Sequence, residues 1–379
     1  MGESRSAVRA CLSLFCAIAT SRRLRTCGRF VVALAWLCPL AQSADWPEFG
    51  GNADRTDVTA ETLQLPLSLA WSFQANHPPS PAFKGLTRLP TTAAAIAYDH
   101  AFHPVVADGR LYFGSSTEEA VFCLNARTGE MEWVFWTEGA VRLAPTVWKG
   151  KALFGSDDGH VYCLDAKTGE PAWKFQAAPG QRRCIGNERI VSAWPVRTGV
   201  TVADGVAYFA SGLLPPQGVH LHAVNADTGK PVWQRQIPYS PNGRILADGD
   251  RLWLPTGRTC PAEFKRTDGA PLEPEPNLRR AQGGSLVRKL GDLIVYGPCE
   301  SGILHLRIPD EPATPPSKYA RNARPTGGLT GLHGRCMIGG ARVFAARDDL
   351  LMAVDKATLR QAVARSCAAM LKAAVSYRL

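Results

Sequence analysis

Four arginines and a tryptophan occupy one short stretch of the sequence: Arg182, Arg183, Arg189, Trp194 and Arg197. A guanidinium donates several hydrogen bonds from a planar fork, and an indole offers a flat apolar surface, so this set suits an acidic or aromatic group. We therefore expect ligand binding at Arg183, Trp194 and Arg197. The alternative is that the stretch covers a sheet edge and that Trp194 is buried.

Other reactive residue types form no recognisable catalytic or metal-binding pattern. His220 and His222 would face the same side of a strand and could form a metal pair, although a surface strand is the simpler interpretation. Asp157, Asp158 and Gly159 lack the spacing of a calcium loop and indicate a hairpin tip. The sequence contains neither GxSxG nor CxxC. We therefore expect no catalytic residue and no metal site.

A repeated unit surrounds these residues. LNARTGEMEW (124–133) returns 40 residues later as LDAKTGEPAW and 60 residues after that as VNADTGKPVW. Each copy is preceded by a segment that resembles DGRLYFGS (108–115). In the second copy, APTVWKG, KALFGS, VYCLDA and PAWKFQ alternate like strands and are separated by glycine turns. A period of 40 with four strands per unit predicts propeller blades.

The expected fold is an all-β propeller of four-stranded antiparallel blades, about six in number and not necessarily complete, with a short C-terminal helix. Trp71 lies in LAWSFQA, which matches PAWKFQA of the second unit, so we expect it on an extra fourth strand that completes the three strands of 335–358. The repeated tryptophans should fill the spaces between blades, and the glycines should allow positive φ in the turns. These structural positions are Gly129, Trp133, Gly169, Trp173, Gly229 and Trp233.

The arginine-rich stretch interrupts the repeat. Trp133 and Gly150 are separated by 17 positions, whereas the equivalent Trp173 and Gly205 are separated by 32, which places an insertion at 181–195. A second insertion lies around 213–217. In a four-stranded meander both connections emerge on the same face, so we expect the insertions to share one rim, where binding residues concentrate.

The N-terminus has the features of an export signal. Basic residues up to Arg29 precede an apolar run at 30–41, and small residues precede Ala44. The expected organisation is a signal peptide at 1–43, an N-terminal extension at 44–70, the propeller at 71–360 and a C-terminal helical tail at 361–379. The alternative is an uncleaved anchor. We expect a periplasmic or otherwise exported protein with no transmembrane segment in the mature chain.

The net charge of +10 does not indicate a nucleic-acid partner. Residues 1–43 contain six arginines and one acidic residue, so half of the excess lies in the leader. The remainder is mild and forms no basic stripe.

The AxxTGxxxW pattern, preceded by DGxxYFGS, resembles the tryptophan-docking blades of the pyrroloquinoline quinone (PQQ) repeat families. These include quinoprotein alcohol dehydrogenases and the outer-membrane assembly factor BamB. The opening DWPEFGGNADRTDVT and the stretch 154–200 resemble exported planctomycete-type members. The resemblance covers about 45–360, and the tail departs from it, which suggests a truncated or frameshifted C-terminus.

The resemblance implies two functions. A PQQ-dependent oxidoreductase would need PQQ with calcium, but the sequence has no adjacent cysteines and no CxxCH. We therefore expect a non-catalytic, BamB-like scaffold of the cell envelope, with no cofactor. Its partner at the loop face would be another envelope protein or a small ligand. The dehydrogenase is kept as the alternative.

Overall fold

The computed structural model describes residues 44–62, 65–83, 98–186, 188–257, 259–272, 284–297, 305–307, 335–339, 342–347, 350–355, 357–358 and 375–378. The chain divides into two compact units, Met1–Gln42 and Ser43–Leu379, and all described residues belong to the second. The expected signal peptide at 1–43 therefore lies outside the described residues.

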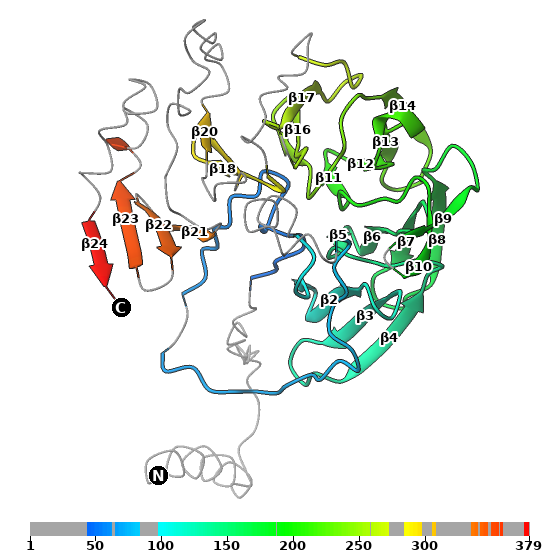
Figure 1. Ribbon diagram of the computed structural model, residues 1–379. Helices are drawn as coiled ribbons and strands as arrows, with labels where there is room; N and C mark the ends of the chain where they lie inside the picture. Colours follow the sequence, from blue (N-terminus) through cyan, green and yellow to red (C-terminus); the bar gives the residue numbers. More distant parts are fainter. Residues whose placement is uncertain are drawn as a thin grey trace, which may run out of the picture. The chain divides into compact units, whose positions relative to one another are not determined.

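Six of the seven small antiparallel sheets in the described chain, called blades 1 to 6, follow one another along it (Figure 1). Blade 1 contains β1 (Val105–Ala107), β2 (Arg110–Ser115), β3 (Ala120–Asn125) and β4 (Met131–Trp136). Blade 2 contains β5 (Thr146–Trp148), β6 (Lys151–Gly155), β7 (His160–Asp165) and β8 (Pro171–Gln176). Blade 3 contains β11 (Thr201–Ala203), β12 (Val206–Ser211), β13 (His220–Asn225) and β14 (Pro231–Gln236).

Blades 4 and 5 have three described strands each, and blade 6 has four. Blade 4 contains β15 (Leu246–Asp248), β16 (Arg251–Leu254) and β17 (Ala262–Lys265). Blade 5 contains β18 (Leu286–Leu290), β19 (Leu293–Gly297) and β20 (His305–Arg307). Blade 6 contains β21 (Arg335–Gly339), β22 (Arg342–Arg347), β23 (Leu350–Asp355) and β24 (Val375–Arg378). The first strands of neighbouring blades lie side by side, β1 with β5, β5 with β11, β11 with β15 and β15 with β18. The predicted all-β propeller of four-stranded blades is confirmed.

The turn between the third and fourth strands shows why the repeat motif folds this way. In blade 2, the side-chain Oδ1 of Asp165 accepts hydrogen bonds from the backbone N–H groups of Lys167 and Thr168, at 2.9 and 2.8 Å. Gly169 then adopts a φ of 76°, which side chains with a Cβ resist. The same arrangement recurs at Asn125 with Gly129 and at Asn225 with Gly229.

A tryptophan from each of the first three blades docks on the next blade. The Nε1–H groups of Trp133, Trp173 and Trp233 donate to the backbone carbonyls of Ala166, Ala226 and Arg266, at 3.1, 3.2 and 2.9 Å. Each ring also lies against the turn glycine of that next blade: a Cβ on Gly169 would stand 2.8 Å from the ring of Trp133. The turn therefore requires glycine both for its conformation and for space.

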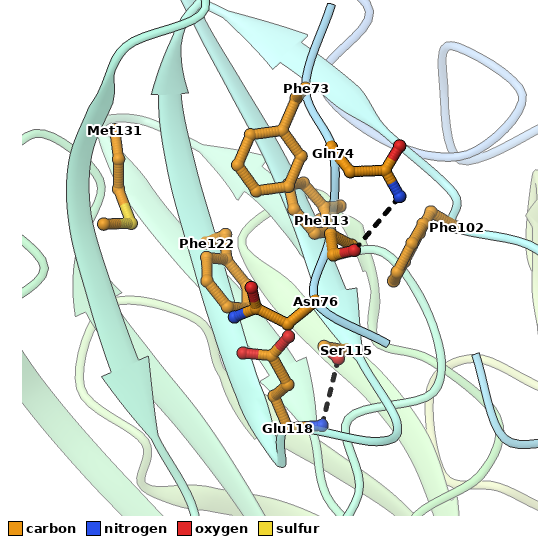
Figure 2. Close-up of a pocket in the computed structure, with 10 residues that line it drawn as sticks. Phe73, Gln74, Asn76, Phe102, Phe113, Ser115, Glu118, Phe122 and Met131 are labelled. Atoms are coloured by element: carbon orange, nitrogen blue, oxygen red, sulfur yellow. Dashed lines mark hydrogen bonds between the residues drawn. The ribbon is translucent and has the colours of Figure 1, made fainter. Parts of the chain in front are cut away.

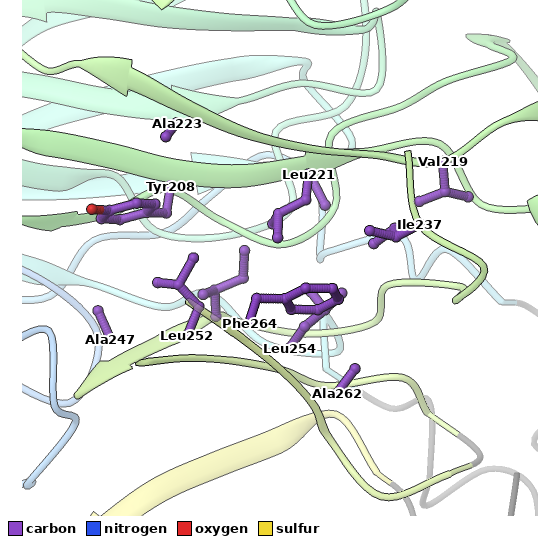
Figure 3. Close-up of a cluster of buried hydrophobic side chains, with 12 residues drawn as sticks. Tyr208, Val219, Leu221, Ala223, Ile237, Ala247, Leu252, Leu254, Ala262 and Phe264 are labelled. Atoms are coloured by element: carbon purple, nitrogen blue, oxygen red, sulfur yellow. The ribbon is translucent and has the colours of Figure 1, made fainter. Parts of the chain in front are cut away.

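The hydrophobic core is divided among the spaces between blades. Figure 3 shows the cluster between blades 3 and 4, where Tyr208 and Leu221 lie close to Leu252 and Phe264. All four side chains are almost completely buried. Because each such cluster draws on two blades, burial of apolar area ties neighbouring repeats together.

Residues 46–55, the central segment, connect the first strands of several blades. Trp46 pairs with Val106 of β1, and the Pro47 carbonyl accepts a hydrogen bond from Val147 of β5 at 2.7 Å. Farther along, the carbonyls of Ala53 and Asp54 accept from Ala247 of β15 and Lys289 of β18, at 3.1 and 3.3 Å. Arg55 is 2% exposed and donates to Thr201 of β11 at 2.7 Å and to the Ile245 carbonyl. The central segment thus reaches blades 1 to 5.

The C-terminus differs from its prediction. Residues 375–378 of the expected helical tail form β24, which pairs with β23, while 361–374 lie outside the described residues. Pairing with the open edge of β23 supplies backbone hydrogen bonds that override the local helical periodicity. The expected strand at Trp71 is also absent, because residues 71–75 belong to no sheet and β24 takes the fourth place in blade 6.

Candidate binding surface

The first insertion folds into a two-stranded ribbon, β9 (Arg183–Gly186) and β10 (Arg189–Ser192). Ile185 and Ile190 stand directly opposite each other in it, so both side chains lie on one face. They are 86% and 62% exposed. On the other face, Val191 is buried and Arg189 is paired with Glu119 of blade 1 at 2.7 Å. The ribbon is therefore anchored on one face and presents two isoleucines on the other.

The second insertion contacts the first, as the rim prediction requires. It contains a turn of 3-10 helix, η2 (Pro215–Gln217). The Nε1–H of Trp194 donates to the Gln217 carbonyl at 2.8 Å, and the Gly212 N–H donates to the Pro195 carbonyl at 3.0 Å. Leu214 is 53% exposed beside this contact. The two insertions together form one continuous surface, which we call the rim surface.

Arg183 and Trp194, two of the expected ligand-binding residues, lie on the rim surface. The Arg183 guanidinium is half exposed and forms an ion pair with Glu138, which is also exposed. Trp194 is partly exposed, and the Arg182 guanidinium lies 5.5 Å from the centre of its ring. Because exposed ion pairs contribute little to stability, Arg183 can exchange Glu138 for an acidic group of a partner at small cost.

Arg197, the third expected residue, lies in a buried ionic cluster instead. Its Nε and Nη2 atoms donate to both carboxylate oxygens of Asp157 at 2.8 Å. Arg142 donates to the same carboxylate at 2.8 Å and to Asp99 at 2.9 Å. All four side chains are at most 4% exposed. The cluster holds the loops of blades 1 to 3 together and keeps Arg197 away from solvent.

The electrostatics of this cluster follow from its pairing. Burial alone would raise the pKa of Asp157, but the guanidiniums of Arg197 and Arg142 outweigh it and hold the pKa below its usual value. Burial alone would lower the pKa of Arg197, but Asp157 raises it above the normal value. Asp157 was expected at a hairpin tip, and it does follow β6. Its burial was not foreseeable, because Asp99 and Arg142 are distant in sequence and belong to no shared motif.

The histidine pair does not form an exposed metal site. His222 is 2% exposed, its ring stacks on Phe209 with centroids 5.1 Å apart, and its Nε2 lies 3.0 Å from the Ser211 hydroxyl. Burial lowers its pKa to about 3. The surface-strand interpretation is therefore wrong for His222, because its side chain is buried between blades 2 and 3.

PQQ with calcium, the cofactor that the resemblance implies, would require several oxygen ligands at one place. Within the described ranges, no three His, Cys, Asp or Glu side chains gather in a way that could hold a metal ion. In addition, the central segment is hydrogen-bonded to the first strands of blades 1 to 5. Among the described residues, acidic side chains alone therefore supply no calcium site for the quinone.

The described residues also contain no helix that is long and apolar enough to cross a bilayer.

Comparison with solved structures supports the fold. The quinohemoprotein alcohol dehydrogenase from Comamonas testosteroni matches with a TM-score of 0.53 and 16% identity, over 81% of this chain and 58% of that one. Quinohemoprotein alcohol dehydrogenase ADHIIG from Pseudomonas putida HK5 matches with a TM-score of 0.52 and 16% identity, over 70% of this chain and 46% of that one. The chain thus spans about half the length of these enzymes. At such identity the likeness concerns the fold alone. No curated protein matches the sequence.

A family profile described as outer membrane protein assembly factor BamB matches residues 68–260. The matched region contains blades 1 to 3 with their docking tryptophans and the start of blade 4, and it amounts to half of the chain. The chain therefore belongs to this PQQ-repeat, BamB-like family.

Proposed function

We propose that the protein is a non-catalytic binding scaffold of the cell envelope, which captures an extended polypeptide segment on the rim surface. The observation that carries the proposal is the pair Ile185 and Ile190, exposed side by side on an anchored ribbon. Apolar side chains gathered on a rigid surface favour association, because a partner removes them from water.

The anchoring of the ribbon reduces the ordering that binding would require. An isolated two-stranded hairpin is marginally stable in water. Here Val191 is buried and Arg189 is held by Glu119 and by the Thr117 carbonyl, at 2.7 and 3.0 Å. The isoleucines are therefore held in place before a partner arrives, which lowers the entropic cost of binding.

The chemistry of the rim surface selects among partners. Arg182 and Arg183 precede Ile185 in the sequence, and Trp194 adds an aromatic surface against the Arg182 guanidinium. A strand with alternating apolar side chains and at least one acidic residue matches this set. Export to the periplasm, where the protein would meet envelope proteins, is part of the same proposal and rests on the leader-like N-terminus and the BamB-like family.

Site-specific photo-cross-linking in the cell of origin tests the proposal. A photoreactive amino acid at position 185 or 190 should give a discrete protein adduct. The control position is Val232 of β14, which is also apolar and 54% exposed but lies away from the insertions. Identical products from 185 and 232, or a small-molecule adduct only, would contradict capture of a polypeptide.

A titration of the purified protein with PQQ and Ca²⁺ tests the proposal that the scaffold is non-catalytic. We expect no saturable quenching of tryptophan fluorescence. Stoichiometric quenching that requires calcium would overturn the proposal in favour of the dehydrogenase.

A further inference from the structure

Arg244, two residues before β15, is a buried cation with unused hydrogen-bond donors. It is 7% exposed, and its buried Nη2 atom has no hydrogen-bond partner among the described residues. The Cζ atom of its guanidinium lies 3.9 Å from the centre of the Phe49 ring in the central segment. The face of an aromatic ring attracts a guanidinium, but it is a poor substitute for an oxygen that accepts its N–H groups.

The repeat does not require an arginine at this position. The first strands β5, β11 and β15 are equivalent, and the residues that stand two positions before β5 and β11 are Ala144 and Gly199. The side chain of Arg244 passes over Gly199, where a Cβ would stand 3.4 Å from the Arg244 Cγ. Two other blades therefore form with a small residue here, and the blade fold gives no reason for a buried charge at position 244.

Two further guanidiniums lie beside the Phe49 ring, and we call Arg55, Arg244 and Arg288 the central arginines. The Cζ atoms of Arg288 and Arg55 are 5.5 and 5.9 Å from the centre of the ring. Arg55 donates to backbone carbonyls, whereas Arg288 forms an ion pair with Asp57 and leaves its buried Nε without a hydrogen-bond partner. Burial, and after it the charges of Arg55 and Arg288, lowers the pKa of Arg244 well below its usual value.

The titratable groups closest to Phe49 do not compensate this positive charge. Glu48 is 6% exposed, and its Oε2, like the Nη2 of Arg244, has no hydrogen-bond partner. Burial raises the pKa of Glu48 to about 7, against the opposing charges of Arg55 and Arg244, so at lower pH the carboxyl is a neutral donor. Burial lowers the pKa of His103, which meets the edge of the Phe49 ring, to about 4.

The other nearby acidic groups already have cationic partners. Asp57 pairs with Arg288, and Asp54 pairs with Lys289 at 3.5 Å. Neither carboxylate supplies a partner for the Nη2 atom of Arg244. A buried charge without a counter-charge is costly, so the described surroundings of the central arginines favour the entry of an anion.

The pocket on blade 1 does not suit such an anion. Its volume is about 150 Å³, and its lining includes the rings of Phe73, Phe113 and Phe122 (Figure 2). Glu118 is the one ionisable side chain among the residues that line it. Aromatic rings beside a carboxylate repel an anion, so the central arginines are the better place for one.

We propose that Arg244 binds a compact oxyanion, a carboxylate or a phosphate group, against the central segment. A guanidinium fork matches two oxygens of such a group, and the Nε–H of Arg288 and the protonated carboxyl of Glu48 are further unused donors. These donors come from the central segment, from the connection before β15 and from β18. The bound anion therefore ties the central segment to blades 4 and 5, and this site is separate from the rim surface.

Equilibrium dialysis of the purified protein tests the site with two probes, radiolabelled inorganic phosphate and radiolabelled acetate. The measurement is made at constant ionic strength and at about pH 6, where Glu48 keeps its proton. We expect saturation at about one anion per chain, and at least about tenfold weaker binding by Arg244→Ala, since a hydrogen bond to a charged group is lost. Saturable binding of phosphate alone assigns a phosphate group, and saturable binding of acetate alone assigns a carboxylate.

The matched control is Arg235→Ala, which removes the same charge from an exposed position on β14 and should keep wild-type binding. Alanine is the residue of blade 2 at the position equivalent to 244, so Arg244→Ala should fold. Arg244→Gln, which keeps the length of the side chain but loses its charge, gives the same comparison if the alanine variant does not fold.

The stability of the protein provides an independent measurement. A ligand that binds the folded state alone stabilises it, so the anion that binds should raise the urea midpoint of the wild type and of Arg235→Ala, but not of Arg244→Ala. An equal rise in all three proteins would be a general salt effect and would overturn the proposal. Absence of saturable binding, or wild-type binding by Arg244→Ala, would overturn it as well, and neither result bears on cross-linking at the rim surface.

Discussion

Arg183 and Arg197 belong to the same connection between blades 2 and 3, yet their surroundings are opposite. Arg183 is half exposed and paired with Glu138, which is also exposed, whereas Arg197 is 4% exposed and donates to both oxygens of a buried carboxylate. Exposed pairs can be exchanged at small cost, but a buried pair leaves an uncompensated charge when one partner is removed. The first arginine is therefore accessible from solvent, and the second holds together the loops beneath the rim surface.

Replacement of Arg197 should have one of the two largest effects on folding. Arg197→Ala leaves Asp157 buried with Arg142 as its one remaining cationic partner, and should lower the free energy of unfolding by ~3–5 kcal/mol. Chemical denaturation measures this loss. Arg197→Lys is an intermediate variant, because it keeps the positive charge but loses the planar guanidinium that donates to both carboxylate oxygens. A loss below about 1 kcal/mol would mean that Arg197 is not needed for folding and would return it to the set of ligand-binding residues.

The contact of Trp173 with blade 3 provides a reference for the destabilisation expected of Arg197→Ala. Trp173→Ala removes a ring that packs on Gly229 and donates to Ala226, and should cost ~3–5 kcal/mol in the same measurement. Gly229→Val should also destabilise, because φ is 69° there and a Cβ would stand 2.8 Å from the Trp173 ring. A small effect of both changes on the unfolding free energy would show that the packing of Trp173 on Gly229 does not hold the two blades together.

Glu48 shows how a buried carboxylate behaves without the pairing that Asp157 has. Its Oε2 is buried and has no hydrogen-bond partner. Burial raises its pKa from 4.5 to about 7, against the opposing charges of Arg55 and Arg244. The folded state therefore keeps a proton that the unfolded state releases, so stability falls as the pH rises through this window.

The change Glu48→Gln should remove this pH dependence, because an amide stays neutral. Relative to the variant, the wild type should lose about 3 kcal/mol of unfolding free energy between about pH 4 and about pH 8. Parallel urea titrations at the two pH values measure the difference, and the comparison cancels the contribution of other carboxylates. Equal pH dependence of both proteins would show that Glu48 is ionised in the folded state.

The sequence predicts the parts of the molecule that repeat and misses those that occur once. Trp173 and Gly169 recur at fixed spacing, so their strand and turn can be inferred by comparison within the chain. The insertion at 181–195 is visible as extra length, and its position on the rim follows from strand connectivity. The burial of Arg197 has no such signal, because its partners come from different loops. The C-terminal strand was missed because pairing with β23 is a long-range contact, whereas helical spacing is local.

Arg183 should show the smallest effect on folding and a clear effect on binding. Arg183→Ala removes one exposed ion pair, so the unfolding free energy should change by less than about 0.5 kcal/mol. If the rim surface binds a partner with an acidic residue, the same change should reduce the adduct formed by a photoreactive group at position 190.

Arg235→Ala is the matched control, because this arginine is exposed on β14 and donates to the Asp268 carbonyl at 2.8 Å, away from the insertions. Equal adduct yields in the two variants would remove Arg183 from the binding surface, whereas unfolding of the Arg183 variant would show that Glu138 and the ribbon depend on it. Only loss of the adduct with unchanged stability preserves the distinction between a binding arginine at position 183 and a supporting one at position 197.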